Sequence, residues 1–199
     1  MIITIDGPAG SGKSTVAKEL AKELKNYYLY TGLLYRAVAY IWLNKLNKKL
    51  QDLDKATSKD FEFISKISYE YYENNPEIFY EGERLTPFLN QTTLDQPASI
   101  LSARKDVREN LLEIQQSVAK NYDIVADGRD CGSVVFPDAD YKFFLTASLG
   151  VRAKRIISDK NRGENILDLE KVKEELKKIR KMKRGGKCIY TIRNDLKIK

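Results

Sequence analysis

The sequence predicts an α/β fold in which helices cover a parallel β-sheet. Short β-branched runs alternate with segments whose apolar residues recur at helical spacing, which is the pattern of parallel strands joined by helices. A glycine-rich turn separates the first such strand from the first such helix. The length of 199 residues allows one full domain with a small insertion, and it excludes a long repeat array.

The elements follow one another in a regular order. Residues 2–5 are predicted as a buried strand, 13–24 as a helix and 27–30 as a second strand, followed by a helix that includes Leu34 and Trp42. Residues 67–72 and 78–80 are β-prone and separated by a turn at 73–76, which predicts a small antiparallel excursion. The remaining prediction is a helix over 97–120, strands over 123–126 and 141–147, helices over 150–159 and 169–183, and a final strand over 188–192.

The composition favours a soluble protein with an anionic ligand. Lys and Arg number 35 against 28 Asp and Glu, and this net charge of +7 suits either nucleic acid or a phosphorylated small molecule. The absence of His excludes His-based metal sites, Ser-His triads and imidazole bases. Cys131 and Cys188 are too few for a zinc site and are expected to be reduced thiols. With no secretory signal and no apolar stretch of membrane-spanning length, we expect a cytoplasmic protein.

Residues 7–14 match the phosphate-binding motif G-x-x-x-x-G-K-S/T at every fixed position. A strand precedes the motif and a helix follows it, which disfavours a chance glycine-rich turn and predicts a three-layer P-loop NTPase fold. We expect Lys13 to reach the β- and γ-phosphates of ATP, and the Ser14 hydroxyl to bind Mg²⁺. The predicted ATP-binding residues are Gly7, Pro8, Ala9, Gly10, Ser11, Gly12, Lys13, Ser14 and Thr15.

Three further segments point to the second substrate. Thr31 ends a strand and Arg36 follows on the next helix, Ser99 and Arg108 lie nine positions apart on one predicted helix, and charges cluster at 127–130 after another strand. Ligands of open α/β sheets bind at the carboxyl ends of strands, so Asp6, Thr31 and Asp127 are expected around one crevice.

These segments resemble the bacterial cytidylate kinase family, which phosphorylates CMP and dCMP. The resemblance covers residues 1–180. It rests on I-D-G-P-A-G-S-G-K-S-T at 5–15, T-G and Y-R within 31–36, P-A-S at 97–99 and V-R at 107–108. The most specific match is D-G-R-D-C-G-S-V-V-F-P-D-A at 127–139, followed by K-F-F-L-T-A-S at 142–148.

The resemblance implies in-line transfer of the ATP γ-phosphoryl group to CMP or dCMP, with Mg²⁺. It also implies that Arg36 and Arg129 hold the acceptor phosphate, while Ser99, Arg108 and Asp130 bind cytosine. Cytosine offers an amino donor beside two acceptors, which a carboxylate, an Arg and a Ser can satisfy. The predicted acceptor-binding residues are Thr31, Arg36, Ser99, Arg108, Arg129 and Asp130. Taken singly, each of these has a simpler explanation as a helix cap or a solvated helix face.

The same resemblance implies a single kinase domain with a core of 1–60 and 96–199, an acceptor-binding insert at about 61–95 and a lid at about 150–166. Arg152 and Arg155 are candidate lid arginines that join Lys13 and Arg129 in balancing the phosphate charge. A basic helix face is the alternative for these two arginines. We expect a monomer that binds neither nucleic acid nor a membrane.

The C-terminal part departs from the family pattern. Members usually carry an Arg-Asp-x-x-Asp-x-x-Arg stretch that binds the acceptor ribose, but residues 180–187 hold no acid. This predicts weaker acceptor binding and poorer discrimination between ribose and deoxyribose. Two alternatives stay open: another small-molecule P-loop kinase, such as a dephospho-coenzyme A or shikimate kinase, and a catalytically impaired nucleotide-binding or nucleic-acid-binding protein with a basic segment at 177–187.

Overall fold

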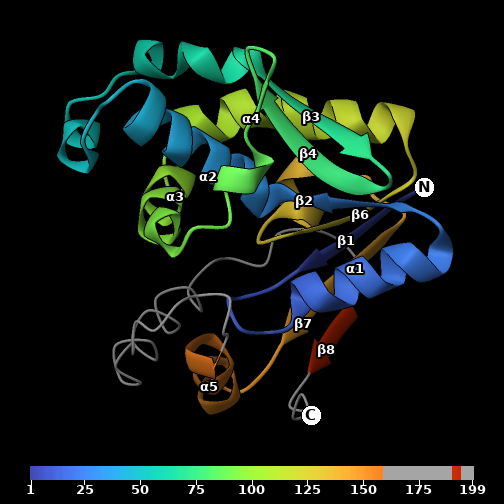
Figure 1. Ribbon diagram of the computed structural model, residues 1–199. Coiled ribbons are helices and arrows are strands. Elements are labelled where there is room, and N and C mark those ends of the chain that lie inside the picture. Colours follow the sequence, from blue (N-terminus) through green and yellow to red (C-terminus); the bar gives the residue numbers. More distant parts are fainter. Residues whose placement is uncertain (159–189, 194–199) are drawn as a thin grey trace. The chain divides into compact units, whose positions relative to one another are not determined.

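The computed structural model describes residues 1–158 and 190–193, and the chain folds into two compact units (Figure 1). The first unit consists of Met1–Tyr28 and Asp123–Lys199, and the second of Leu29–Tyr122. The two ends of the chain therefore build one unit together, and the middle of the chain builds the other.

A five-stranded sheet with the order β2-β6-β1-β7-β8 confirms the predicted α/β class. Its strands are β1 (Ile2–Asp6), β2 (Tyr27–Tyr30), β6 (Ile124–Gly128), β7 (Tyr141–Thr146) and β8 (Tyr190–Arg193). β1 pairs in parallel with β6 and β7, and β7 pairs in parallel with β8. In the register of β1 with β6, Asp6 is opposite Gly128 and Ile5 is opposite Asp127. The loops that follow these two strands therefore start at the same edge of the sheet.

The first helix, α1 (Lys13–Leu24), begins and ends where the sequence predicted. Its Ala17 and Ala21 pack against buried apolar side chains of three adjacent strands: Ile3, Ile5, Val125 and Leu145. Alanine has the smallest side chain that still favours a helix, so it lets α1 approach the sheet closely. This packing fixes the start of α1 relative to the end of β1.

The second unit contains the predicted antiparallel excursion. Strands β3 (Ile67–Tyr72), β4 (Asn75–Tyr80) and β5 (Glu83–Arg84) form a sheet in that order, and it lies within the predicted insert. Glu73 and Asn74, between β3 and β4, both have positive φ angles, which is the requirement of a two-residue hairpin turn. The helices are α2 (Thr31–Tyr40), extended by a π-helical turn over Ile41–Lys45, α3 (Asp95–Ser102) and α4 (Lys105–Asn121).

The prediction of a single helix over 97–120 is wrong, because the helix is interrupted between α3, which ends at Ser102, and α4, which begins at Lys105. Arg104 stands at the break with an extended backbone, at φ −79° and ψ 130°. No glycine or proline lies at this position, so the helical spacing of apolar residues predicted one uninterrupted helix through it. The cause is tertiary: the Arg104 side chain bonds to a neighbouring segment of the chain and to Asp106.

The remaining predictions concern the end of the chain and its cysteines. α5 (Leu149–Ser158) corresponds to the helix predicted over 150–159. The helix predicted over 169–183 and the second half of the predicted lid lie outside the described residues. Cys131 is buried, and Cys188 lies outside the described residues. Among the described residues, no helix has the length and hydropathy needed to cross a membrane.

Candidate active site

The phosphate-binding loop, residues 7–14, joins the end of β1 to the start of α1 (Figure 1). Gly10 and Gly12 have φ angles of 72° and 89°, a region that favours glycine. A Cβ at Gly7 would collide with the carbonyl oxygen of Leu145, and one at Gly10 would lie 2.5 Å from that of Arg152. No side chain caps α1 and no acid lies in its first turn, so its positive end suits a phosphate.

Asp127 lies beside this loop because β6 is the neighbour of β1. Asp127 is 1% exposed, and its carboxylate accepts hydrogen bonds from Ser14 Oγ at 2.5 Å and from Tyr28 Oη at 3.1 Å. Burial raises the pKa of Asp127, while the charge of Lys13 and the two hydroxyl donors act in the opposite direction. A carboxylate paired with the loop serine fits the oxygen ligands that Mg²⁺ prefers. From its position at a strand end, Asp127 was expected to line the ligand crevice, but the sequence predicted no role for Asp127 or Tyr28.

A second buried carboxylate, Asp6 at the end of β1, anchors the segment that follows Arg129 and Asp130. Its Oδ1 accepts a hydrogen bond from Cys131 N and its Oδ2 one from Gly132 N, both at 2.8 Å. Burial raises the pKa of Asp6, and the two backbone donors oppose this shift. Arg129 is exposed and Asp130 is half-buried. Both directly precede the backbone of Cys131 and Gly132 that Asp6 holds in place.

Arg152 and Arg155, on α5, contact the phosphate-binding loop from outside. Arg152 is 3% exposed, and it donates hydrogen bonds to the carbonyl oxygens of Ala147 at 3.1 Å and Ala9 at 3.5 Å. Arg155 donates to the carbonyl oxygens of the next two loop residues, at 3.3 and 3.2 Å. The C=O and N–H of a trans peptide point in opposite directions. These contacts therefore favour inward-pointing N–H groups in the loop.

On the acceptor side, Thr31 is buried at the start of α2, and Arg36 lies on the same helix. Arg36 donates from Nη1 to the carbonyl oxygens of Leu89 and Gln91, at 3.0 and 3.1 Å, and from Nη2 to the Asp95 carboxylate. It thus clamps residues 89–95 onto α2. A guanidinium has five N–H donors, so a phosphate can add to these bonds or replace the contact with Asp95.

The two remaining acceptor-side residues lie on separate helices and not on one. Ser99 is exposed on α3, and Arg108 is half-buried on α4. Thr31, Arg36, Ser99 and Arg108 all belong to the second unit, whereas Arg129 and Asp130 belong to the first. Residues 177–187, where the sequence departs from the family pattern, lie outside the described part of the chain.

Comparison with known proteins connects this geometry to a family. The sequence matches the cytidylate kinase family over residues 3–187. A cytidylate kinase from Thermodesulfovibrio yellowstonii is 46% identical over 154 residues, which is 77% of this chain and 68% of that protein. A cytidylate kinase from Caldanaerobacter subterraneus subsp. tengcongensis is 40% identical over 186 residues, covering 93% of this chain and 80% of that protein.

Longer and more distant proteins match as well. A bifunctional pantoate ligase/cytidylate kinase from Prochlorococcus marinus is 41% identical over 183 residues, and the match spans 34% of its length. Among solved structures, a shikimate kinase from Acinetobacter baumannii is 17% identical, with a TM-score of 0.43 over 91% of this chain and 74% of that chain. The family match covers nearly the whole sequence, including the phosphate-binding loop and the segment around Arg129: the chain belongs to the cytidylate kinase family.

Proposed function

We propose that the protein transfers the γ-phosphoryl group of ATP to the phosphate of CMP or dCMP, which yields ADP and CDP or dCDP. One observation carries this proposal: the phosphate-binding loop places Ser14 against the buried Asp127 in a chain of the cytidylate kinase family. The acceptor nucleophile is an already ionised phosphate, so the reaction needs no general base. The absence of His from the sequence is therefore no obstacle.

The donor side holds the polyphosphate and screens its charge. The loop N–H groups and Lys13 bind the phosphates, and Ser14 and Asp127 would hold Mg²⁺, which neutralises charge on the phosphate oxygens when bound. The Ser14 hydroxyl donates a hydrogen bond to Asp127, so its oxygen lone pairs stay available to a cation. Among the described residues no three carboxylate or thiol side chains gather into a metal site, which fits an ion held partly by the nucleotide.

The acceptor side would bind the monophosphate through its phosphate and its base. We expect Arg36 and Arg129 to bind the phosphate, with Thr31 nearby at the start of α2. Asp130 would accept a hydrogen bond from the amino group of cytosine, and Ser99 and Arg108 would bind the remaining polar edge of the base. Uracil presents a carbonyl where cytosine has the amino group, and the resulting unpaired carboxylate costs about 1–3 kcal/mol. The enzyme would therefore prefer cytosine by about one to two orders of magnitude.

The roles of Arg152 and Arg155 in balancing phosphate charge stay predictions. In the structure their guanidinium groups bond to backbone carbonyls of the loop. This supports an action on the transferred phosphate through the loop. The predicted insert at 61–95, the lid at 150–166 and the monomeric state also stay proposals.

The test is an assay of ADP release from Mg²⁺ and ATP with CMP, dCMP, UMP, AMP, GMP and shikimate in parallel. We expect turnover with CMP and dCMP to exceed turnover with every other acceptor. Binding of ATP without turnover on any acceptor would contradict the proposal and favour an impaired nucleotide-binding protein. The ratio of kcat/KM for CMP to that for dCMP tests the expected loss of ribose discrimination.

A further inference from the structure

We propose that Arg104 is a positioning residue for recognition of the acceptor base. It fixes the junction of α3 and α4, and thereby the orientation of Ser99 relative to Arg108. The inference rests on the proposed function, in which Ser99 and Arg108 bind cytosine. It concerns a residue that makes no predicted contact with either nucleotide.

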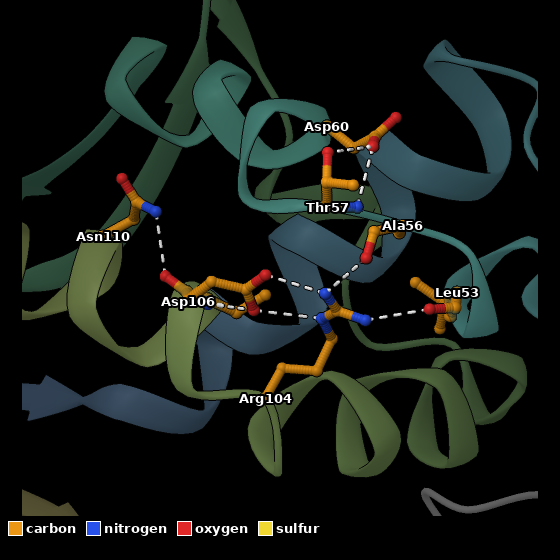
Figure 2. Close-up of polar contacts among 8 residues, drawn as sticks. Leu53, Ala56, Thr57, Asp60, Arg104, Asp106 and Asn110 are labelled. Atoms are coloured by element: carbon orange, nitrogen blue, oxygen red, sulfur yellow. Dashed lines mark hydrogen bonds and ion pairs between the residues drawn. The ribbon is translucent and has the colours of Figure 1, made fainter.

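The Arg104 guanidinium is held from two sides (Figure 2). Nε and Nη2 form a two-pronged pair with the two oxygens of Asp106, at 3.0 and 2.7 Å. Nη1 donates to the carbonyl oxygen of Leu53 at 2.8 Å, and Nη2 also donates to that of Ala56 at 2.9 Å. Two of these four hydrogen bonds therefore tie the junction to residues 53–56, a segment about fifty positions earlier in the chain, and the other two are local bonds to Asp106.

An aromatic stack fixes the same guanidinium against the core of the second unit. Its central carbon lies 4.8 Å from the ring centre of Phe61, which stacks on Trp42 at 5.2 Å. The ammonium of Lys48 lies 4.4 Å from the Trp42 ring. Phe61 and Trp42 are at most 1% exposed. The stack therefore gives Arg104 a rigid platform, to which a planar cation is well suited.

The backbone of Arg104 connects the two helices that carry the proposed base contacts. Its N–H donates to the carbonyl oxygen of Leu101 in the last turn of α3, at 3.1 Å. Its carbonyl accepts the N–H of Arg108 in the first turn of α4, at 3.2 Å. Ser99 precedes Leu101 by two residues. A change in the dihedral angles of Arg104 would therefore move Ser99 and Arg108 relative to each other.

Only an arginine can supply all of these contacts. Lysine keeps the charge but has neither the planar fork nor the flat face, so it can meet only some of the partners. Arg104→Lys is therefore expected to loosen the junction without removing its positive charge. Misplacement of binding groups by a fraction of an ångström lowers catalytic efficiency without removing any group that touches the substrate.

The experiment measures KM and kcat for CMP and UMP, and KM for ATP, in the full chain. For Arg104→Lys we expect KM for CMP to rise about tenfold and the preference for CMP over UMP to fall about tenfold. KM for ATP and kcat at saturating CMP should change less than about twofold. Lys105→Gln is the matched control, because Lys105 is the adjacent cation and its side chain is 88% exposed. It should leave every constant unchanged.

Two further variants separate the possible outcomes. Arg108→Gln removes a proposed base contact directly, so an unchanged preference for CMP in that variant, or none in the wild type, would overturn the proposed acceptor site and this inference with it. If Arg108→Gln loses the preference while a folded Arg104→Lys keeps it, only the inference about Arg104 is overturned. Should Arg104→Lys fail to fold, Asp106→Asn is judged by the same criterion. Loss of the fold in both would assign Arg104 a purely structural role and overturn the inference.

Discussion

The two units stabilise their carboxylates in different ways. In the first unit, Asp6 and Asp127 lie at strand ends and accept hydrogen bonds from backbone and hydroxyl donors, and burial raises the pKa of both carboxyl groups against the lowering effect of the Lys13 charge. In the second unit, the arginines of three separate segments each pair with a carboxylate: Arg36 with Asp95, Arg84 with Glu77, and Arg104 with Asp106.

The difference separates two uses of charge. A buried carboxylate at a strand end is costly unless cations or strong donors meet it, and a bound cation is one such partner, so these groups are candidates for ligand binding. The charge of a paired arginine is balanced within the protein, so the arginine holds neighbouring segments in position unless a ligand displaces its partner. The first unit is therefore expected to lose catalysis when its charges are changed, and the second to lose positioning or stability.

The largest expected effect is the loss of the positive charge in the phosphate-binding loop. Lys13→Met should lower kcat/KM for ATP about a thousandfold, since it removes a charge directed at the phosphates. Steady-state kinetics with varied ATP at saturating CMP measures it. Lys18→Met changes an exposed lysine of the same helix and should leave the activity unchanged. A fall of less than tenfold in Lys13→Met would contradict the role given to Lys13.

The second effect concerns Asp127 alone. Asp127→Asn keeps the shape of the side chain but removes its charge, so the Mg²⁺ concentration for half-maximal activity should rise about 10- to 100-fold. Calorimetry should show that ATP binding without Mg²⁺ changes little, which separates a loss of metal binding from a damaged loop. The control is Asp123→Asn, an exposed carboxylate just before β6 that pairs with the N-terminal amine. An unchanged Mg²⁺ requirement in Asp127→Asn would exclude Asp127 from the metal site.

This contrast also explains what the sequence could predict. The loop, α1 and β3 depend on local signals, namely glycines with positive φ and apolar periodicity, and their predicted positions were confirmed. The predicted hairpin exists, but β4 begins at Asn75, three residues earlier than predicted, because its turn needs only Glu73 and Asn74. The break at Arg104 and the burial of Arg152 depend on partners distant in the sequence. Arg104 has good helix propensity, and Arg152 fits a basic helix face equally well. Neither pattern contains the tertiary contact that decides the outcome.

A smaller effect tests whether a ligand competes with an internal pair of the second unit. Asp95→Asn weakens the hold on Arg36, so KM for CMP should fall about two- to fivefold if the acceptor phosphate uses the released donors. The free energy of unfolding should fall by about 1 kcal/mol, because the pair is only partly exposed. Glu83→Gln breaks the more exposed Lys45–Glu83 pair and should change neither quantity. A rise in KM for Asp95→Asn would show that Asp95 holds Arg36 in its binding position.

The smallest expected effect is on the free energy of unfolding at acid pH. It tests whether the ion pair of Lys48 with Asp60 in the second unit stabilises the fold. The Lys48 ammonium, at 2.5 Å, and the donors of Thr57 lower the pKa of Asp60 to about 2. Figure 2 shows the two hydrogen bonds from Thr57 to Asp60. The pKa of Asp60 is thus lower in the folded chain than in the unfolded chain, where it is about 3.9. The stabilisation is therefore fully present above about pH 4 and is lost as the pH falls towards 2.

Asp60→Asn should accordingly unfold at a lower urea concentration than the wild type at pH 7, and the difference should shrink as the pH falls from 4 to 2. Urea midpoints at several pH values measure it. Lys48→Met removes the ionic partner but keeps the Thr57 donors, so it should reproduce only part of the change. A difference that stays constant down to pH 2 would mean that Asp60 acts through packing and not through its charge.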